Sequence, residues 1–581
     1  MLIALLLLLI AASRAMRLNV NFNEVTVDEV WSVWQTLGSP NDIIRWTPYD
    51  WTPLYYLGLG AWRGLVGIHP VVLRWLSLLC FVIGAAAMIR VAQRLKASPL
   101  ITMLAFAVPN YLIFMSVELR GYVFLLALYP LAIWFALRYL AVPHWRRMLP
   151  LVLAMTAMIY TSLTSMMALP MMGLFTLFLY PRRLWRWFMP VIATIILCIP
   201  EILNKAELIV NRTRATFTID LPPVIEALAA IYRTWASDLV VGWIILLGIA
   251  LFFIRRDTRK ALIAGLLMWG TFPIILYVTN GQIGFFNQRY AWWVMVGLAL
   301  LIGVGSAHSP RWLRQMVVAA LTLCLFIPLS IEPYQILTTR LGWAFQWLET
   351  RVQPGDVILL DPQCNCGDLE IFDYYSQVYL AQRAQFVQAP RVYRRVWYIT
   401  GAAGATPDVL AQVQQGRRAD VFFGPPEGLF RLYEAPPNAE GILFANGMRF
   451  HGIDVLSSTV LPLYHEGDTV RFRLWWSVDQ QVPLDYSVSI LLSNPTGTPI
   501  VQQDSAPQIM SALDLPHETS QWIINQFYIE ERTLQLPDTL GRAVYPLVMA
   551  VYWYGDQVRL NAPSISAEGF LHLADITVLS W

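Results

Sequence analysis

Charged residues are scarce in this chain: they make up 14% of its 581 residues, whereas hydrophobic residues make up 57%. Soluble globular domains carry about 25% charged residues. The composition therefore excludes an ordinary soluble protein and places most of the chain in a lipid bilayer. The small net charge of +3 gives no indication of nucleic-acid binding. A chain of this length is also expected to form more than one domain.

The signatures of common soluble enzymes are absent as well. The sequence has no phosphate-binding glycine-rich loop, no G-x-S-x-G and no H-E-x-x-H, and its 7 histidines do not cluster. These absences argue against nucleotide-driven chemistry, and no metal ligands are predicted. The 5 cysteines exclude a disulfide scaffold. Cys80, Cys198 and Cys324 lie in apolar runs, and Cys364-Asn-Cys366 is expected to hold free or mutually oxidised thiols.

Long apolar runs dominate the first half of the chain, and runs of about 17–25 residues predict membrane-spanning helices. We count about eleven on this length criterion, at 1–16, 71–90, 99–116, 122–141, 148–163, 164–180, 185–203, 239–254, 261–278, 290–307 and 315–331. The first run is short and lacks a basic start, which favours a retained helix over a signal peptide. The runs 148–163 and 164–180 are close enough to form one bent element.

The charges between these runs are sorted by side. One set of loops contains a single acid, Asp257, and the cations Arg90, Arg94, Lys96, Arg138, Arg146, Arg147, Arg182, Arg183, Arg186, Arg255, Arg256, Arg259, Lys260, Arg311 and Arg314. The opposite loops contain the acids Glu24, Asp28, Glu29, Asp42, Asp50, Glu118, Glu201, Glu207, Asp220, Glu226 and Asp238. Because basic loops face the cytoplasm, we expect a multi-pass plasma-membrane protein with a cytoplasmic N-terminus and an extracytoplasmic C-terminal part.

The composition changes at Ile331-Glu332-Pro333, beyond which no run is long enough to span a membrane. Short strands at Val357–Leu360, Val396–Thr400 and Arg431–Glu434, with a helix at Asp408–Gln415, predict a small α/β domain. Alternating apolar residues at 470–478 and 486–490 predict the strands of a β-sandwich. The expected fold class is a mainly α membrane protein with three domains: a helical bundle at 1–331, an extracytoplasmic α/β domain at 332–438 and an extracytoplasmic β-sandwich at 439–581.

The most informative polar residues are Asp28 and Glu29. They stand in an external segment, about 17–70, whose many aromatic residues indicate short amphipathic helices in the membrane interface. The acidic pair is therefore expected near the lipid headgroups on the outer side. It forms either a solvated helix start, where acids are favoured, or a general base for an acceptor hydroxyl.

Arginines stand at several outer ends of the spans. Glu118 and Arg120 form either a structural pair or part of a site, because ionisable groups at such a depth are costly. Arg74 and Arg289 occupy similar boundaries. Arginine binds phosphate oxygens bidentately. Each arginine alone could simply extend to the interface, but their occurrence at one face suits a lipid phosphate.

Several short segments occur in a characteristic order, namely Asp28-Glu29-x-Trp-Ser, Asp50-Trp-Thr-Pro-Leu-Tyr-Tyr56, Leu73-Arg-Trp-Leu-Ser77, Glu118-Leu-Arg-Gly-Tyr122, Tyr160-Thr-Ser and Gln288-Arg-Tyr290. In this order the chain, over about residues 1–330, resembles bacterial GT-C glycosyltransferases. The closer likeness is to the family 39 group, which includes protein O-mannosyltransferase-like and aminoarabinose-transferase-like enzymes. In one departure, Trp51 and Thr52 replace the first two residues of the family's His-Pro-Pro-Leu-Tyr, which leaves the sugar preference open.

The resemblance implies a GT-C-type bundle and an inverting glycosyltransferase with a polyprenyl-phosphate sugar as donor. The acceptor would be a glycan, a lipid or a protein. Asp28 is then the expected base, with Glu29 and Glu118 as further catalytic candidates. We expect the donor phosphate at Arg120, Tyr122, Arg289, Tyr290 and Arg74, and an acceptor or sugar pocket at Asp50, Trp51 and Tyr55. No cofactor is predicted, although a divalent cation is left open because related folds include both kinds.

Two other functions are compatible with these features. A transporter or flippase for a lipid-linked sugar would also have many spans and outer-face charges. Transporters, however, often show inverted repeats and broken midplane helices with buried ionisable groups, whereas here the ionisable residues lie at span ends. The remaining alternative is a non-enzymatic surface-assembly protein whose external sandwich is the working part.

Overall fold

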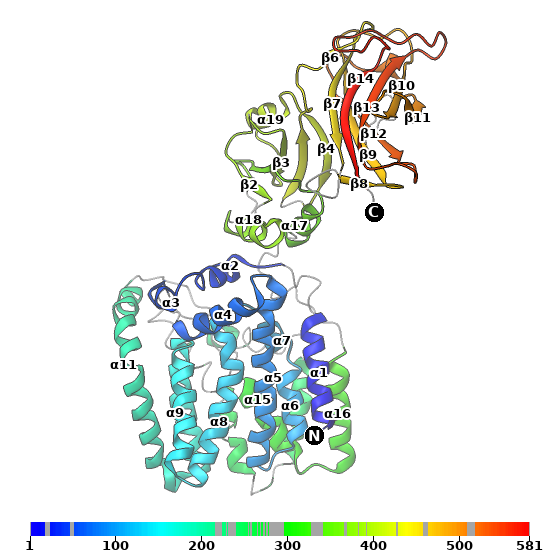
Figure 1. Ribbon diagram of the computed structural model, residues 1–581. Helices are drawn as coiled ribbons and strands as arrows, with labels where there is room; N and C mark the ends of the chain where they lie inside the picture. Colours follow the sequence, from blue (N-terminus) through cyan, green and yellow to red (C-terminus); the bar gives the residue numbers. More distant parts are fainter. Residues whose placement is uncertain are drawn as a thin grey trace. The chain divides into compact units, whose positions relative to one another are not determined.

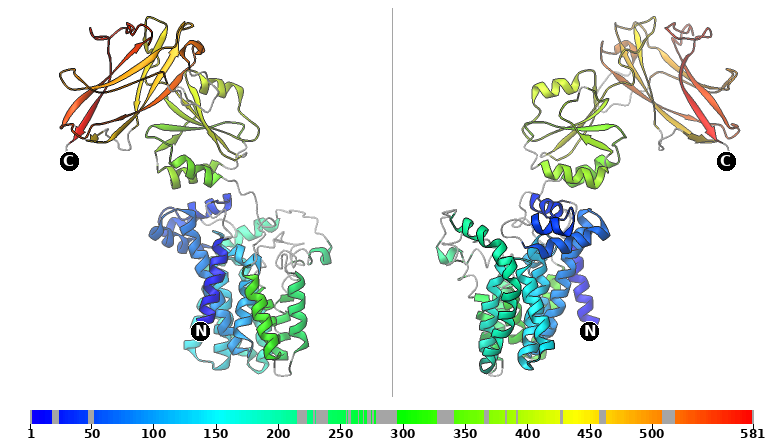
Figure 2. Two further views of the ribbon diagram at one scale, coloured as in Figure 1. Left: turned by 90° about the vertical axis from the view of Figure 1, so that its right-hand side faces the viewer. Right: turned by 60° about the vertical axis from the view of Figure 1, so that its left-hand side comes forward.

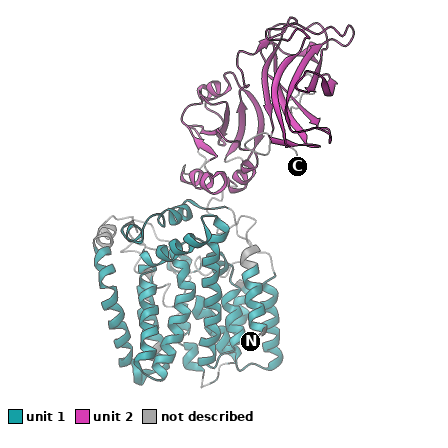
Figure 3. Ribbon diagram, in the orientation of Figure 1, with its two compact units in different colours: residues 1–338 teal, residues 339–581 magenta. Residues whose placement is uncertain are grey.

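The computed structural model describes residues 2–17, 24–46, 52–214, 223–227, 240–253, 258–263, 295–326, 341–364, 369–381, 383–390, 392–425, 428–456, 463–507 and 518–579, with a few further residues between 229 and 277. The chain divides into two compact units, Met1–Thr338 and Thr339–Trp581 (Figure 3). The predicted boundaries at 331/332 and 438/439 stay predictions.

The first unit is helical. Most of its described helices run side by side (Figures 1 and 2). They are α1 (Leu2–Arg17), α5 (Pro70–Arg94), α6 (Pro99–Ala107), α7 (Asn110–Met115), α8 (Leu125–Ala141), α9 (Trp145–Ile159), α10 (Ala168–Leu179), α11 (Leu184–Arg214), α13 (Val240–Phe252), α15 (Met295–Ser306) and α16 (Arg311–Cys324). Short 3₁₀ turns, η1 (Gly121–Phe124), η2 (Leu163–Met167) and η3 (Pro181–Arg183), precede α8, α10 and α11.

Among the described residues, 3 helical stretches are long and apolar enough to cross a membrane: Pro70–Arg94, Gly121–Ala141 and Pro181–Ala206. Shorter apolar helices cover Ile3–Ser13, Val241–Phe252 and Met295–Ser306. The predicted span 99–116 is divided between α6 and α7 at Pro109, which lacks the backbone N–H needed for a helical hydrogen bond. The runs 148–163 and 164–180 are separate elements, because α9 ends at Ile159 and η2 begins at Leu163. The full count of membrane crossings stays a prediction.

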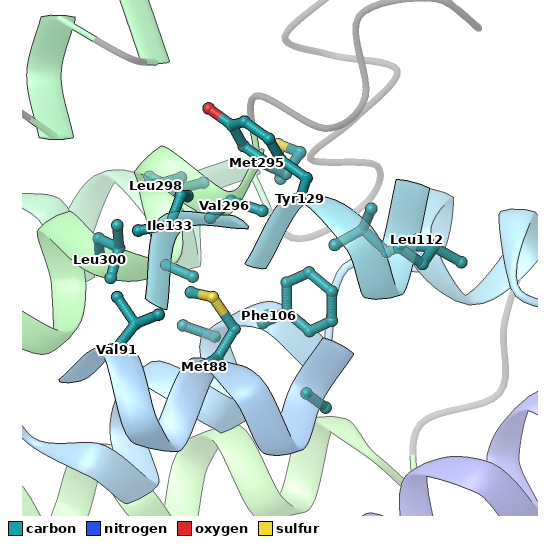
Figure 4. Close-up of a cluster of buried hydrophobic side chains, with 14 of the residues drawn as sticks. Met88, Val91, Phe106, Leu112, Tyr129, Ile133, Met295, Val296, Leu298 and Leu300 are labelled. Carbon is teal, nitrogen blue, oxygen red and sulfur yellow. The ribbon is translucent and has the colours of Figure 1, made fainter. Parts of the chain in front are cut away.

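The core of the bundle is built from helices that are apolar on every side. All residues of α15 are buried, as expected of a helix enclosed by neighbours. Figure 4 shows how α5, α6, α7, α8 and α15 contribute to one cluster. Its labelled members, all buried, are Met88, Val91, Phe106, Leu112, Tyr129, Ile133, Met295, Val296, Leu298 and Leu300.

Three short helices lie across one end of the bundle: α2 (Val27–Trp34), α3 (Pro40–Trp46) and α4 (Pro53–Val66) (Figure 1). They keep large apolar side chains exposed, among them Trp31, Ile44 and Leu65. This combination is typical of amphipathic helices in a membrane interface. The external segment predicted to be helical is therefore helical where it is described, and it carries Asp28 and Glu29 onto the end of the bundle.

The second unit begins with an α/β part. Its sheet has the strand order β2-β1-β3-β5-β4, in which β1 pairs parallel with β2 and β3, and β5 pairs antiparallel with β3 and β4. The strands are β1 (Asp356–Leu360), β2 (Ala384–Phe386), β3 (Arg395–Thr400), β4 (Arg418–Phe423) and β5 (Leu429–Glu434). The helices are α17 (Leu341–Glu349), α18 (Leu369–Tyr375) and α19 (Pro407–Gln414). The predicted strands near 357, 396 and 431 and the helix near 408 are confirmed.

The rest of the unit is a sandwich of two sheets, with strand orders β11-β10-β13-β14-β8 and β12-β9-β7-β6. The strands are β6 (Ile442–Leu443), β7 (Met448–Val455), β8 (Leu463–His465), β9 (Thr469–Val478), β10 (Ser487–Ser493), β11 (Pro499–Ser505), β12 (Tyr528–Gln535), β13 (Ala543–Tyr552) and β14 (Leu571–Leu579). Buried side chains such as Trp476, Val488 and Leu547 fill the space between the sheets. The predicted alternation in β9 holds at its start but not at its end, where Trp475 and Ser477 are buried too.

Candidate active site

The site begins with the local sequence Thr26-Val-Asp-Glu29, which starts α2. The Thr26 side-chain oxygen accepts a hydrogen bond from the Glu29 N–H (3.3 Å), and the Glu29 carboxylate accepts one from the Thr26 N–H (2.9 Å). This reciprocal arrangement is a capping box, in which side chains satisfy the free N–H groups of the first turn. It fixes both acidic residues in the first turn of α2. The Thr-x-x-Glu spacing that signals this box is present in the sequence at Thr26 and Glu29.

Glu29 is buried, and its side chain is only 4% exposed. Arg74 Nη2 lies 2.9 Å from each Glu29 carboxylate oxygen. The backbone N–H of Leu119 donates to Oε1 of the same carboxylate at 3.0 Å. Arg74 also donates to the Glu24 carbonyl at 2.6 Å. Glu29 therefore ties α2 to α5 and to the segment before η1. The structure therefore brings Glu29 and Arg74 together in a buried ion pair.

Asp28, one residue earlier, has a different environment. Its side chain is 52% exposed, and its Oδ2 lies 3.2 Å from Arg120 Nη1. The same Nη1 donates to the Asp28 carbonyl oxygen at 3.2 Å. The Arg120 side chain is 13% exposed and stands at the N-cap position of η1. The pair thus presents an accessible carboxylate next to a largely enclosed guanidinium group.

Glu118 and Tyr122 flank Arg120 in the sequence and contact each other in the structure. The Tyr122 hydroxyl donates a short hydrogen bond to the Glu118 carboxylate. The Ser77 hydroxyl of α5 donates to the Glu118 carbonyl at 2.6 Å. These two contacts hold both sides of Arg120 in the turn between α7 and α8. One partner that the structure shows for Arg120 is Asp28, and whether Glu118 and Arg120 act as a structural pair or as part of the site stays a prediction.

Tyr55 lies in the first turn of α4 and is completely buried. Its ring packs edge-on against Tyr56 and Phe124, with ring centroids 5.2 Å apart in both pairs. Burial, followed by the neighbouring Tyr56 and the Glu29 carboxylate, raises the pKa of the Tyr55 hydroxyl well above its usual value. A backbone hydrogen bond from Leu54 N–H to the Tyr160 carbonyl (2.9 Å) joins the start of α4 to the end of α9. Tyr160, one of the resemblance positions, therefore lies beside α4.

Two hydroxyl groups at the start of α4 are buried without a hydrogen-bond partner among the residues that the structure describes: those of Thr52 and Tyr55. Orphaned buried polar groups are uncommon in folded proteins and call for an explanation. The burial of Thr52 comes from packing, and the sequence carries no signal for it. Asp50, Trp51, Arg289 and Tyr290, which were also predicted to form the site, lie outside the described residues.

No group of three or more His, Cys, Asp or Glu side chains that could hold a metal ion occurs among the described residues. Elsewhere in that part of the chain, Cys364 is disulfide-bonded, whereas Cys80, Cys198 and Cys324 carry reduced thiols. The site consequently offers an accessible carboxylate, a neighbouring guanidinium group and a buried ion pair. Such a set can accept a proton and stabilise negative charge.

Comparison with known proteins gives weak likenesses. No family model matches the chain, and no curated protein matches it. A crystal structure of ArnT from Cupriavidus metallidurans in the apo state is 12% identical, with a TM-score of 0.44 over 71% of this chain and 94% of ArnT. The same protein bound to undecaprenyl phosphate is 12% identical, with a TM-score of 0.47 over 74% and 96%. The C-terminal domain of wzt is 12% identical, with a TM-score of 0.17 over 24% of this chain and 77% of that domain. Likenesses this weak carry no argument about the fold or the activity, so the GT-C family 39 resemblance stays a prediction from the sequence.

Proposed function

We propose that this protein is an integral membrane glycosyltransferase of the GT-C type, which moves a sugar from a polyprenyl-phosphate donor to an acceptor on the extracytoplasmic face. The observation that carries the proposal is the geometry of Asp28. Its carboxylate is half exposed and lies 3.2 Å from Arg120, on a helix that crosses the end of the bundle (Figure 1). A base in such a place can meet an acceptor from outside and a lipid-borne donor from the bilayer.

In the proposed reaction, Asp28 accepts the proton of the acceptor hydroxyl while that oxygen attacks the anomeric carbon of the sugar. The bond between the anomeric carbon and the phosphate oxygen breaks, and its electron pair leaves with polyprenyl phosphate. Attack opposite to the leaving group inverts the configuration. A positioned base typically contributes about 10²–10⁴-fold to the rate.

Negative charge collects on the departing phosphate, and Arg120 is the described cation that stands closest to the proposed base. Fixed groups that stabilise developing charge can contribute about 2.7–4 kcal/mol each. The sequence suggests Arg289 as a second phosphate ligand. Glu118 and Tyr122 hold the turn that carries Arg120, so we assign them a positioning role.

Glu29 and Arg74 also act as positioning residues in this proposal. A carboxylate that already accepts hydrogen bonds from Arg74, Leu119 and Thr26 is poorly suited to take an acceptor proton. Its contacts instead fix α2 against α5 and the Arg120 turn. The orphaned hydroxyls of Thr52 and Tyr55 support a polar ligand near the start of α4, in agreement with the sugar or acceptor pocket expected at Tyr55.

Two observations support the proposed sidedness. The basic loops indicate a cytoplasmic N-terminus and leave the acidic pair outside. The disulfide at Cys364 suits an oxidising compartment, where disulfides persist. The proposed place of the second unit is therefore extracytoplasmic.

The decisive experiment measures release of polyprenyl phosphate by the purified protein in lipid nanodiscs, with a set of polyprenyl-phosphate sugars as donors. Asp28→Asn should lower turnover by at least about 100-fold, because the amide cannot accept the proton. Asp42→Asn is the matched control. Asp42 also sits in the first turn of a crossing helix, where it caps Ser39, and its loss should leave turnover unchanged.

Two results would count against the proposal. Full turnover in Asp28→Asn removes the base assignment. If the wild-type protein moves labelled lipid-linked sugar between leaflets of a vesicle and releases no polyprenyl phosphate with any donor, the protein is a transporter or flippase instead.

A further inference from the structure

The β-sandwich contains a pocket that the proposed transfer reaction does not use. It measures about 590 Å³ and is lined by residues from three loops at one end of the sandwich. The end of β6 and the turn after it contribute Leu443 and Gly447, the segment after β9 contributes Asp479 and Gln480, and the loop between β13 and β14 contributes Asn561 and Ala562. Pockets of about 300–1,000 Å³ are typical of small-molecule sites.

The pocket is preformed, because backbone hydrogen bonds join its three loops. Ala445 N–H donates to the Asn561 carbonyl, and Asp479 N–H donates to the Gly447 carbonyl, both at 3.0 Å. Gly447 has φ +94°, and a Cβ atom there would lie 2.5 Å from Gln480 Cγ. The positive φ favours a glycine at this position, and a Cβ atom there would displace the Gln480 side chain. A ligand would pay little ordering cost in such a site.

The polar groups of the pocket are two amides and one paired carboxylate. Gln480 and Asn561 are exposed, and neither side chain hydrogen-bonds to another described residue. Each primary amide can donate and accept. Asp479 is held by the Arg449 guanidinium, whose Nε lies 2.9 Å from Oδ1. That hydrogen bond lowers the pKa of Asp479, so the pair is ionised but has no net charge. A carboxylate has about four lone-pair positions, which leaves some for a ligand.

The remaining wall is apolar and accessible. Leu443 is 40% exposed, and Ala562 and Pro563 line the pocket beside it. The Asp479–Arg449 pair has no net charge, so neither an anionic nor a cationic ligand would gain an unpaired charge in this pocket. A neutral ligand with many hydroxyl groups and an apolar C–H face fits the combination of amides, carboxylate and aliphatic wall. A sugar has these properties.

We infer that this pocket is a binding site for a neutral saccharide of one or two sugar units, separate from the proposed transferase site. The inference goes beyond the proposed function, because the sandwich would recognise a glycan whether or not the helical unit transfers a sugar. Gln480 and Asn561 are the residues that would hydrogen-bond to the sugar hydroxyls.

The test uses the full chain in lipid nanodiscs and saturation-transfer NMR with neutral probes: glucose, galactose, mannose, N-acetylglucosamine and their disaccharides. Inorganic phosphate and glucose 1-phosphate serve as anionic probes in competition. We expect at least one neutral saccharide to bind, and we expect Gln480→Ala and Asn561→Ala each to weaken its binding by about tenfold, because each removes a hydrogen-bonding group. Both positions are exposed, so neither variant should unfold the protein. Gln502→Ala removes an exposed amide on β11 outside the pocket and should bind as the wild type does.

Three results would overturn the inference: no neutral saccharide binds, both variants bind as tightly as Gln502→Ala, or the anionic probes displace the sugar at lower concentration than neutral sugars do. Asp28→Asn separates the two proposals. If this variant still binds the saccharide but no longer transfers a sugar, the result supports both the pocket assignment and the transferase proposal. Saccharide binding in a wild-type protein that transfers nothing leaves the pocket assignment intact and removes only the transferase.

Discussion

Asp28 and Glu29 are neighbours in the chain, yet they have opposite environments. Consecutive residues of an α-helix point in directions about 100° apart, because one turn takes 3.6 residues. The capping box fixes the start of α2, and this rotation then turns Glu29 toward Arg74 and leaves Asp28 half exposed. Two chemically similar carboxylates therefore differ in accessibility: one holds the helix in place, and the other remains exposed, as the proposed base must be.

The buried Glu29–Arg74 ion pair should contribute to the stability of the helical unit. Removing one partner of a buried ion pair leaves an uncompensated charge and costs about 3–5 kcal/mol. We expect Arg74→Met to lower the unfolding temperature strongly and to reduce transfer through displacement of α2. The double variant Glu29→Gln with Arg74→Met should recover a large part of the lost stability, because no buried charge remains. Thermal unfolding in detergent measures both effects. Additive losses in the double variant would show that the two side chains are not coupled.

Which residues gather at the site could be predicted in part. Charge sidedness indicated that Asp28, Glu118 and Arg120 share the outer face, and the structure brings all three into the same region. Their individual roles could not be predicted, because they depend on partners that sequence patterns do not reveal. The Leu119 backbone N–H and the Ser77 hydroxyl are such partners. The orphaned hydroxyls of Thr52 and Tyr55 likewise emerge only from packing.

At the scale of elements, the site depends on how closely α5 approaches α8. A Cβ atom on Gly84 of α5 would lie 1.9 Å from the Leu126 carbonyl oxygen at the start of α8. Small residues at helix contacts allow such close approach in membrane proteins. Because α5 carries Arg74 and α8 directly follows the turn that carries Arg120, this contact sets the separation of the two arginine-bearing elements.

Gly84→Ala should therefore reduce both stability and transfer. Inserting a methyl group into a closely packed contact typically costs about 1–3 kcal/mol, although alanine on its own favours a helix over glycine by about 1 kcal/mol. Gly248→Ala, in α13, is the matched control, because nothing lies within 4 Å of its Cβ position. Unfolding temperature and polyprenyl-phosphate release are measured for both variants. If the two variants have equal unfolding temperatures, the α5–α8 contact accommodates the added methyl group without loss of stability.

The elements themselves could be predicted to different extents. Apolar runs predicted the long helices α5 and α11 because span length is set by bilayer thickness. They did not predict the break at Pro109, because the residues on both sides of this proline are mostly apolar and read as one continuous run. Alternation predicted β9 but not the burial of its outer face at Trp475. On that face Trp475 meets the α/β part, since the guanidinium of Arg394, the residue that directly precedes β3, lies 5.8 Å from the centroid of the Trp475 ring.

At the scale of the whole molecule, a network of ion pairs joins the α/β part of the second unit to the sandwich. Arg394, which directly precedes β3, donates to Asp454 of β7 at 2.6 Å, and Arg473 of β9 donates to Glu434 of β5 at 2.7 Å. Glu434 is completely buried and also accepts from Arg395 at 2.6 Å. Buried charges of this kind are stable only when they are paired. The two parts should consequently unfold together in a cooperative transition as long as the network is ionised.

The acid dependence of that transition tests this expectation. Burial would raise the pKa of Asp454, but the hydrogen bond and charge of Arg394, with Arg473 and Trp475, lower it below its usual value of 3.8. A carboxylate with a lowered folded-state pKa contributes stability above its unfolded pKa and loses it as the pH falls through the folded value. The transition temperature of the second unit, followed by calorimetry of the full chain, should thus decline below about pH 4. Asp454→Asn should be less stable at pH 7 and decline less steeply, whereas Asp408→Asn, at the exposed start of α19, should match the wild type. Parallel declines in the wild type and Asp454→Asn would mean that this carboxylate does not link the two parts.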